Sequence, residues 1–317
     1  MIIGVDGTLW GKGDNITGEL GDGTTRRQTF FDQVGEDNDW AWVDTGFWYT
    51  VAIKTDGSLW NWGRNQLNWI LWHHNLPRNI TTPTQVGTDT DWARVAAGSG
   101  ITVATRTDGS LWTWGSNQNG LLGINDNTAR YSLVPVQVGT DTDWVHVFAY
   151  RDRAMAIKTD GSLWGWGSNT NYILGTGTDE HQYSPIQIMP DMTWSTVALG
   201  SGFTIALGTD GSLWGWGLNE FGQLGTGRTS GGRIPRQIGT YTDWVSVAAG
   251  LMFTIATRED GSLWVWGSQI PLFFGGLTTR DHTVPTQIHP YEHWVSVAAG
   301  NNRAFAVTQD GRIKRLG

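Results

Sequence analysis

The 317-residue chain is rich in tryptophan (21) and glycine (44), and only 16% of its residues are charged. Its formal net charge is −8 and its 21 lysines and arginines form no basic run, which argues against a nucleic-acid partner because phosphate binding needs clustered cations. It contains no cysteine, so disulfides and thiolate chemistry are excluded.

The first residues contain no basic segment followed by a long apolar run, as a signal peptide would. No apolar stretch approaches the ~20 residues that span a bilayer. We therefore expect a soluble protein without membrane contact. The sequence does not identify its compartment, and a cytoplasmic location is the default expectation.

One module recurs along the whole chain, beginning after a stub at residues 1–5. An Asp-Gly pair, followed two residues later by Leu or Ile, occurs every ~50 residues; its aspartates are Asp6, Asp56, Asp108, Asp160, Asp210, Asp260 and Asp310. A tryptophan that opens a V-A-A-G-like segment precedes six of these pairs, at Trp40, Trp92, Trp144, Trp194, Trp244 and Trp294. The repeat covers residues 1–317, so we expect a single domain without a linker.

Each module reads as four short strands. Residues 203–217 form two runs around Asp210 and Gly211, a pair that favours the positive φ angles of a tight hairpin turn. Trp214 and Trp216 alternate with other residues, so both indoles face one side of the sheet. Residues 245–250 form a strand of small residues, and residues 235–239 form an edge strand that contains Pro235.

Four antiparallel strands per ~50 residues predict one blade of a β-propeller. We expect indoles from neighbouring sheets to stack between the blades. Strand counting favours six blades over the alternative of seven, with residues 8–13 closing the ring beside the C-terminal strand at residues 304–311. The tail at residues 312–317 is then surplus or an outer cover.

The repeated sequence "WVSVAAGLMFTIATREDGSLWVWGS" resembles the repeat of the regulator of chromosome condensation family, and the likeness extends over essentially the full chain. This resemblance implies a β-propeller, usually of seven blades. The blade pattern is also similar to that of the propeller inhibitor of β-lactamases, which implies binding of a protein through loops at one end.

The modules differ from one another in two sets of residues. One set follows the V-A-A-G segment, and the other follows the W-G-x-N sequence. In an antiparallel meander alternate connections share one end of the sheet, so both sets should lie together and the Asp-Gly turns opposite. A repeated frame that displays varied loops is the arrangement expected for a binding face.

Aromatic, apolar and arginine side chains gather in these loops, and such residues dominate interface energies. The predicted partner-binding residues are Phe47, Trp48, Tyr49, Trp69, Ile70, Leu71, Trp72, His73, Arg151, Arg153, Tyr172, Phe203, Phe221, Leu251, Met252, Phe253, Phe273, Phe274 and Arg303. The alternative is that loop aromatics turn inward and fill gaps between blades.

Catalytic and metal-binding patterns are weak. His73 and His74 are adjacent, and neighbouring strand residues point to opposite faces, so they make a poor chelate. The sequence "GTDTDW" at residues 87–92 and 139–144 faintly resembles a calcium loop, but a turn capped by aspartate side chains is preferred. We expect no enzyme activity, no cofactor and no metal.

The sequence thus predicts an all-β propeller that binds a protein partner through one varied, aromatic-rich face. The second candidate is a glycan-binding propeller, since exposed tryptophans stack on sugars. The third, suggested by the family resemblance, is a nucleotide exchange factor for a small GTPase, although no segment matches an exchange wedge.

Overall fold

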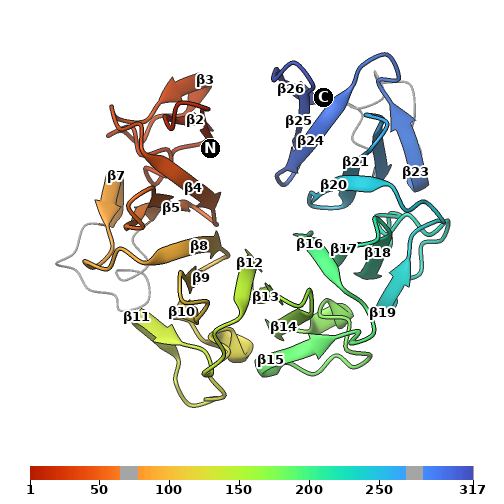
Figure 1. Ribbon diagram of the computed structural model, residues 1–317, viewed down its shortest axis with the longest axis horizontal. Coiled ribbons are helices and arrows are strands. Elements are labelled where there is room, and N and C mark those ends of the chain that lie inside the picture. Colours follow the sequence, from red (N-terminus) through yellow and green to blue (C-terminus); the bar gives the residue numbers. More distant parts are fainter. Residues whose placement is uncertain (65–77, 269–280, 317) are drawn as a thin grey trace. The chain divides into compact units, whose positions relative to one another are not determined.

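The computed structural model describes residues 1–64, 78–268 and 281–316. Within these ranges the chain is all-β, with 26 strands and two short 3-10 helices. The strands form seven antiparallel sheets in chain order, which can be followed by colour in Figure 1. The first and last sheets have three strands, and the five between them have four.

Each sheet consists of strands that are consecutive in the chain. The first sheet contains β1 (Ile2–Ile3), β2 (Leu9–Gly13) and β3 (Gln28–Gln33), and the second β4 (Trp40–Thr45), β5 (Tyr49–Lys54), β6 (Leu59–Arg64) and β7 (Asn79–Gln85). The third contains β8 (Trp92–Ala97), β9 (Ile101–Arg106), β10 (Leu111–Ser116) and β11 (Tyr131–Gln137), and the fourth β12 (Trp144–Tyr150), β13 (Arg153–Lys158), β14 (Leu163–Gly167) and β15 (Gln182–Ile188). The fifth contains β16 (Trp194–Leu199), β17 (Phe203–Gly208), β18 (Leu213–Gly217) and β19 (Gly232–Gln237), and the sixth β20 (Trp244–Ala249), β21 (Phe253–Arg258), β22 (Leu263–Gly267) and β23 (His282–Ile288). The last contains β24 (Trp294–Ala299), β25 (Ala304–Thr308) and β26 (Ile313–Leu316); the 3-10 helices η1 (Gln118–Gly120) and η2 (Thr170–Tyr172) follow β10 and β14.

The prediction of six blades is wrong, and the alternative of seven is correct. β2 pairs with β1 and β3 rather than with the C-terminal strand, while β25 pairs with β24 and β26. The predicted surplus tail therefore supplies β26, the third strand of the last sheet. Strand counting failed because it assumed complete blades, whereas the first and last sheets each lack one strand.

The chain divides into two compact units. Unit 1 comprises residues 1–159 with 182–185, and unit 2 comprises residues 160–181 with 186–317. The prediction of a single domain stays a prediction, and each unit is described by itself. No helix in the described part of the chain is both long and apolar enough to cross a membrane.

The alternating L-W-x-W sequence produces sheets with one aliphatic and one tryptophan-bearing face. In unit 2, Trp244 and Trp266 pack against Ile205 and Leu213 of the preceding sheet. The expectation that indoles fill the space between neighbouring sheets is confirmed, but among the described residues the indole–indole contacts of Trp244 lie within one sheet. Trp244 meets Trp264 and Trp266 of its own sheet edge-to-face, with ring centroids 6.0 and 5.9 Å apart, because all three side chains leave the same sheet face.

Each Asp-Gly turn is a small hydrogen-bonded unit. In the second sheet, one carboxylate oxygen of Asp56 accepts bonds from the backbone N–H and the hydroxyl of Ser58, at 2.9 and 2.6 Å, and that hydroxyl accepts the indole N–H of Trp60 at 2.8 Å. Gly57 has a φ of 79°, and a Cβ there would lie 2.2 Å from the carbonyl oxygen of Thr90. The predicted positive-φ turn is confirmed, and the serine explains why Asp-Gly-Ser recurs before a tryptophan.

These turns predict a dependence of stability on pH. A hydrogen bond from the Ser212 hydroxyl is the main cause that lowers the pKa of Asp210. A carboxyl group whose pKa is lower in the folded state stabilises the fold above its unfolded pKa of about 3.9, and this contribution is lost as the pH falls through the folded pKa. We expect Ser212→Ala to lower the Tm at neutral pH, with the deficit shrinking toward about pH 3. Thermal melts across this range measure it, and a deficit that does not change with pH contradicts the assignment.

The paired aspartates of "GTDTDW" hold a basic side chain. Arg106 lies 2.7 Å from Asp89 and 3.1 Å from Asp91, and its guanidinium stacks 4.5 and 4.3 Å from the ring centroids of Trp92 and Trp112. The same arrangement recurs at Lys54 and at Lys158. These carboxylates therefore serve an ion pair within the sheet rather than a calcium loop or a simple capped turn.

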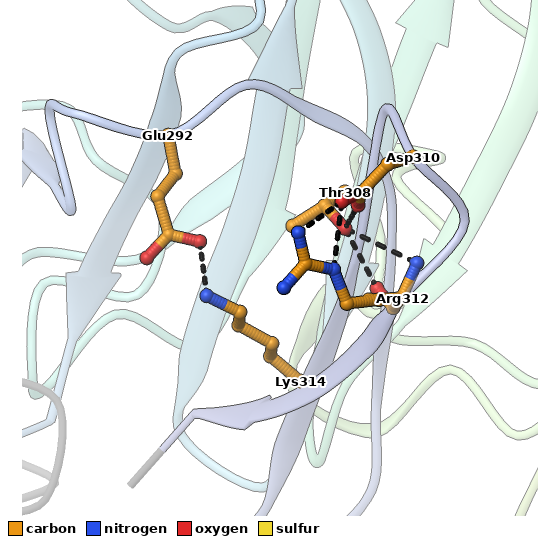
Figure 2. A network of polar contacts seen from close by, with 5 residues as sticks. All are labelled: Glu292, Thr308, Asp310, Arg312 and Lys314. Atoms are coloured by element: carbon orange, nitrogen blue, oxygen red, sulfur yellow. Dashed lines mark hydrogen bonds and ion pairs between the residues drawn. The ribbon is translucent and has the colours of Figure 1, made fainter.

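In the last sheet, the charged residues Arg312 and Lys314 (Figure 2) stand at the positions that Ser262 and Trp264 occupy in the sixth sheet. Lys314 pairs with Ala306 in the ladder, at the position that Trp264 occupies beside Ala256, and its ammonium donates to Glu292 at 2.5 Å. Arg312 forms an ion pair with Asp310, and this hydrogen bond lowers the pKa of Asp310 to about 2. The Arg312–Asp310 pair is exposed, so it contributes little to stability, whereas the Lys314–Glu292 pair is half-buried.

Candidate functional site

Two loops leave the same end of each sheet, as the sequence predicted. The carbonyl of Trp48, between β4 and β5, accepts the backbone N–H of Arg64 at the end of β6, at 2.7 Å. The equivalent bond joins Leu218 to Gly202 at 2.7 Å in unit 2. We call this end of the sheets, opposite the Asp-Gly turns, the loop face.

Neighbouring loops on the loop face of unit 1 are hydrogen-bonded to one another. The backbone N–H of Phe47 donates to the carbonyl of Gly98 at 3.1 Å, and that of Ser99 donates to the carbonyl of Arg151 at 2.9 Å. Three successive loops therefore form a continuous surface. In unit 2, Leu251 donates to Asn301 in the same way at 2.8 Å.

Four of the predicted binding residues are buried, so their predicted exposure is wrong. Tyr49, Arg153, Phe203 and Phe253 are at most 4% exposed, and each is the first residue of the second strand of its sheet. The Tyr49 hydroxyl donates to the carbonyl of Ile101 in the next sheet at 2.5 Å. For these four residues the alternative holds: the side chains fill the interior beneath the loops.

Phe47 and Trp48 form an exposed aromatic pair on unit 1. Their side chains are 49% and 42% exposed, and their ring centroids lie 4.4 Å apart. The Arg64 guanidinium stacks 4.8 Å from the ring centroid of Trp48, and burial lowers the pKa of Arg64. The three side chains make a partly apolar patch with one positive charge, which we call the Trp48 patch.

Trp48 occupies a backbone conformation that suits glycine. Its φ is 73°, and the equivalent residues of two sister loops are Gly100 and Gly202, with φ of 86° and 82°. A residue with a Cβ pays roughly 1–2 kcal/mol for this left-handed conformation. The Trp48 carbonyl is held by Arg64 and by the Thr17 hydroxyl, which donates at 2.8 Å, so hydrogen bonds retain the strained loop.

The remaining described candidates lie at or near the loop face and stay predictions. Arg151 is exposed, has a φ of 52°, and its guanidinium lies 5.7 Å from the ring centroid of Tyr150. Tyr172 is half-buried in η2 beneath the guanidinium of Arg233, at 4.8 Å. Four further candidates are half-buried: Phe221, Leu251, Met252 and Arg303.

Seven candidates fall outside the described residues, and their prediction stays untested. They are Trp69, Ile70, Leu71, Trp72, His73, Phe273 and Phe274. His74, the second residue of the possible chelating pair, is also outside. Within the described ranges, no group of three or more His, Cys, Asp or Glu side chains is placed to hold a metal ion.

Sequence reasoning missed Arg64. It occupies the variable position of W-G-x-N, where the sister modules have Ser116, Ser168, Leu218 and Ser268. Comparison of the modules at that position alone would have singled out the arginine. Its stacking on Trp48 depends on the hydrogen bond between the two loops, which the sequence does not show.

Two family models match the chain, and both are described as the regulator of chromosome condensation (RCC1) repeat. One matches residues 108–157, 160–207 and 210–257, and the other matches residues 92–121, 144–173 and 194–223. Together the matches cover residues 92–257, just over half of the chain. The likeness to the propeller inhibitor of β-lactamases stays a prediction.

Curated relatives match a similar share of the chain. It is 28% identical over 170 residues to the regulator of chromosome condensation of Homo sapiens, and 27% identical over 183 residues to an RCC1 repeat-containing protein of Dictyostelium discoideum. These alignments cover 52% and 53% of this chain, but 39% and 38% of the relatives. The chain therefore matches about two fifths of the length of each relative.

Solved structures show the fold. Human WBSCR16 aligns with a TM-score of 0.82 at 18% identity, covering 98% of this chain and 87% of that chain. Prp20p from Saccharomyces cerevisiae aligns with a TM-score of 0.83 at 20% identity, covering 99% and 82%. Together with the seven sheets, these likenesses identify a seven-bladed β-propeller whose first and last blades are partial.

Proposed function

Because the chain belongs to the regulator of chromosome condensation repeat family, we propose that it is a non-catalytic propeller that binds a protein partner through the loop face of unit 1. Prp20p is described with its binding to Gsp1p and histones, and yeast RCC1 is described bound to Kap60. Both structures are of yeast Prp20, and they support protein binding as a use of the fold. Which protein this chain binds would depend on the sequences of its own loops.

The conformation of Trp48 carries the proposal. A large apolar side chain is held in the left-handed region and remains 42% exposed, where two of the sister loops place glycine. Strain of this kind persists when the surrounding structure enforces it, and it concentrates at functional sites. Tryptophan and arginine are also the residue types enriched in binding hot spots, so the Trp48 patch is the proposed centre of the contact.

A protein partner fits this surface better than a glycan. A lectin built from repeats reuses one pocket in each module, but the loops equivalent to Phe47-Trp48 all lack an aromatic pair: they read Ser99-Gly100, Arg151-Asp152, Ser201-Gly202, Leu251-Met252 and Asn301-Asn302. The aromatic pair therefore makes one asymmetric patch. A glycan remains the second candidate because a sugar ring can stack on the exposed Trp48 indole.

The test replaces the pair with the sister sequence, as Phe47→Ser with Trp48→Gly. Relief of about 1–2 kcal/mol of strain offsets the loss of the ring contacts, worth about 0.5–1.5 kcal/mol for the aromatic pair and about 0.5–1 kcal/mol for the cation–π contact. We expect the free energy of unfolding to change by less than about 1 kcal/mol while partner capture falls at least about tenfold. Quantitative pull-down from a lysate of the organism of origin, combined with urea denaturation, measures both.

Phe30→Ser is the matched control. Phe30 is 82% exposed on β3, so this variant also removes an exposed aromatic ring from unit 1. It should keep the wild-type partners. An unchanged partner set for the double variant, or equal losses for both variants, rejects the Trp48 patch as the contact; a captured glycan in place of a protein selects the second candidate.

A further inference from the structure

The first strands of three sheets in unit 1 carry large side chains at one position. The first strands of three sheets in unit 2 carry small side chains at the equivalent position. The pairing register shifts after the first tryptophan of β4, β8 and β12, and the next paired residue is Trp42, Arg94 or His146. The same shift in β16, β20 and β24 is followed by Thr196, Ser246 and Ser296. Because blades with a small residue at this position fold as well, the fold does not require the three large side chains there.

Trp42 and Arg94 are fixed against each other across two strands. The indole N–H of Trp42 donates to the carbonyl of Val95 at 2.8 Å, which holds the ring over the neighbouring strand β8. The Arg94 guanidinium stacks 4.7 Å from the Trp42 ring centroid, and one of its terminal nitrogens donates to the Ala93 carbonyl at 2.9 Å. The guanidinium is therefore already oriented before any ligand arrives.

The charge of Arg94 is not neutralised by a described carboxylate. Arg106, Lys54 and Lys158 are each held by two aspartates, but no ion pair to Arg94 occurs among the described residues, and its buried Nε has no acceptor. Asp44, two residues beyond Trp42, points its carboxylate to the backbone N–H groups of Ala97 and Thr45. The nearest acid on β4 is thus engaged elsewhere.

His146 on β12 adds a second basic group. Burial is the main cause that lowers its pKa, and the charge of Arg94 lowers it further. β8 contacts both β4 and β12, so the three side chains belong to adjoining strands. Because its pKa lies below the ordinary value of about 6.5, the His146 imidazole is uncharged at neutral pH, and Arg94 beside the Trp42 ring supplies the positive charge of the site, in a chain whose net charge is −8.

We infer that Trp42, Arg94 and His146 form a second binding site, for a glutamate or aspartate side chain of an acidic polypeptide segment. The Arg94 fork suits a carboxylate, and the Trp42 ring suits the aliphatic stem of the acidic residue. Trp42 is 37% exposed, so its ring is accessible to a side chain of a partner polypeptide. The site is separate from the Trp48 patch and does not depend on it.

NMR titration of the histidine side chains tests the inference. The chain has seven histidines, and loss of one signal in His146→Gln assigns the resonance. The probe is a blocked peptide of alternating glutamate and glycine. We expect it to raise the pKa of His146 by about 1 unit, because a nearby opposite charge favours the protonated imidazole. Arg94→Gln should weaken peptide binding about tenfold or more, since it removes a charge-assisted hydrogen bond.

Three controls separate the outcomes. Arg26→Gln removes an exposed arginine elsewhere in unit 1 and should bind the peptide like the wild type. The Phe47→Ser, Trp48→Gly variant should also bind it, even if the proposed function fails. The inference is overturned if a glutamine–glycine peptide shifts the His146 pKa equally, if a folded Arg94→Gln variant binds normally, or if free glutarate binds as tightly as the peptide.

Discussion

Replacing Trp216 by alanine is expected to lower the free energy of unfolding by about 3–5 kcal/mol. The side chain is fully buried in β18, and its indole N–H donates to the carbonyl of Ile173 at 2.9 Å. A Cβ on Gly175 would lie 2.8 Å from the indole nitrogen, so the loop that follows β14 packs directly on the ring. The substitution therefore opens a cavity and removes one of the two hydrogen bonds to the Ile173 carbonyl, which keeps the bond from the Thr204 hydroxyl at 2.8 Å.

Trp214→Ala in the same strand is the matched control. Trp214 is half-buried, and its indole N–H donates to the Ser212 hydroxyl at 2.8 Å near the Asp-Gly turn. We expect a smaller loss, of about 1–2 kcal/mol. Urea denaturation compares the two variants, and limited proteolysis of residues 168–178 shows whether the loop loosens in Trp216→Ala. Equal losses for the two variants would contradict this role of the buried ring.

The features that could be predicted from the sequence depend on residues close to one another in the chain. Asp210, Gly211 and Ser212 form their turn within a few residues, and the alternation of Leu213 with Trp214 and Trp216 sets the two faces of one strand. These local rules were sufficient for the all-β class, the four-stranded blade and the shared end of the variable loops. The same rules count strands but do not say whether a terminal blade is complete, which is why six blades were expected.

Burial of loop side chains depends instead on the neighbouring sheet. Trp48 and Tyr49 are adjacent and both aromatic, yet Trp48 is exposed and Tyr49 is 4% exposed. The difference arises because the Tyr49 hydroxyl reaches Ile101, 52 residues away, and Trp48 sits at a positive φ that turns its side chain outward. The sequence pattern of a single module shows neither the bond from Tyr49 to the next sheet nor the positive φ of Trp48. A comparison between modules indicates the conformation of Trp48, since glycine at the equivalent positions 100 and 202 marks a left-handed residue.

Replacing Asn219 by alanine is expected to cost about 2–4 kcal/mol, although the residue lies at the start of a variable loop. Its side chain is 1% exposed. The amide oxygen accepts the backbone N–H of Leu224 at 2.8 Å, and the amide nitrogen donates to the carbonyls of Arg228 and Ser230 at 2.8 and 3.1 Å. Alanine leaves the buried N–H of Leu224 without its acceptor, which costs about 1–3 kcal/mol, and it also removes the two bonds to the carbonyls of Arg228 and Ser230, which are exposed residues.

Two further variants separate the hydrogen bonds from the loss of the side chain. Asn219→Asp keeps the acceptor for Leu224 but removes both donors, so it should be destabilised as well, whereas Glu220→Ala alters the exposed neighbour and should change the free energy of unfolding by less than about 0.5 kcal/mol. Denaturant midpoints of the three variants measure this order, and an Asn219→Ala variant as stable as Glu220→Ala would refute it.

Asn117 and Asn169 hold the loops of their own sheets with equivalent bonds. Because the bonds from all three asparagines go largely to backbone groups, one repeated residue anchors loops of different sequence. The loop side chains are thereby left to vary. This is how a repetitive frame can present a patch such as Phe47-Trp48 in one blade and serine-glycine in the next without losing its stability.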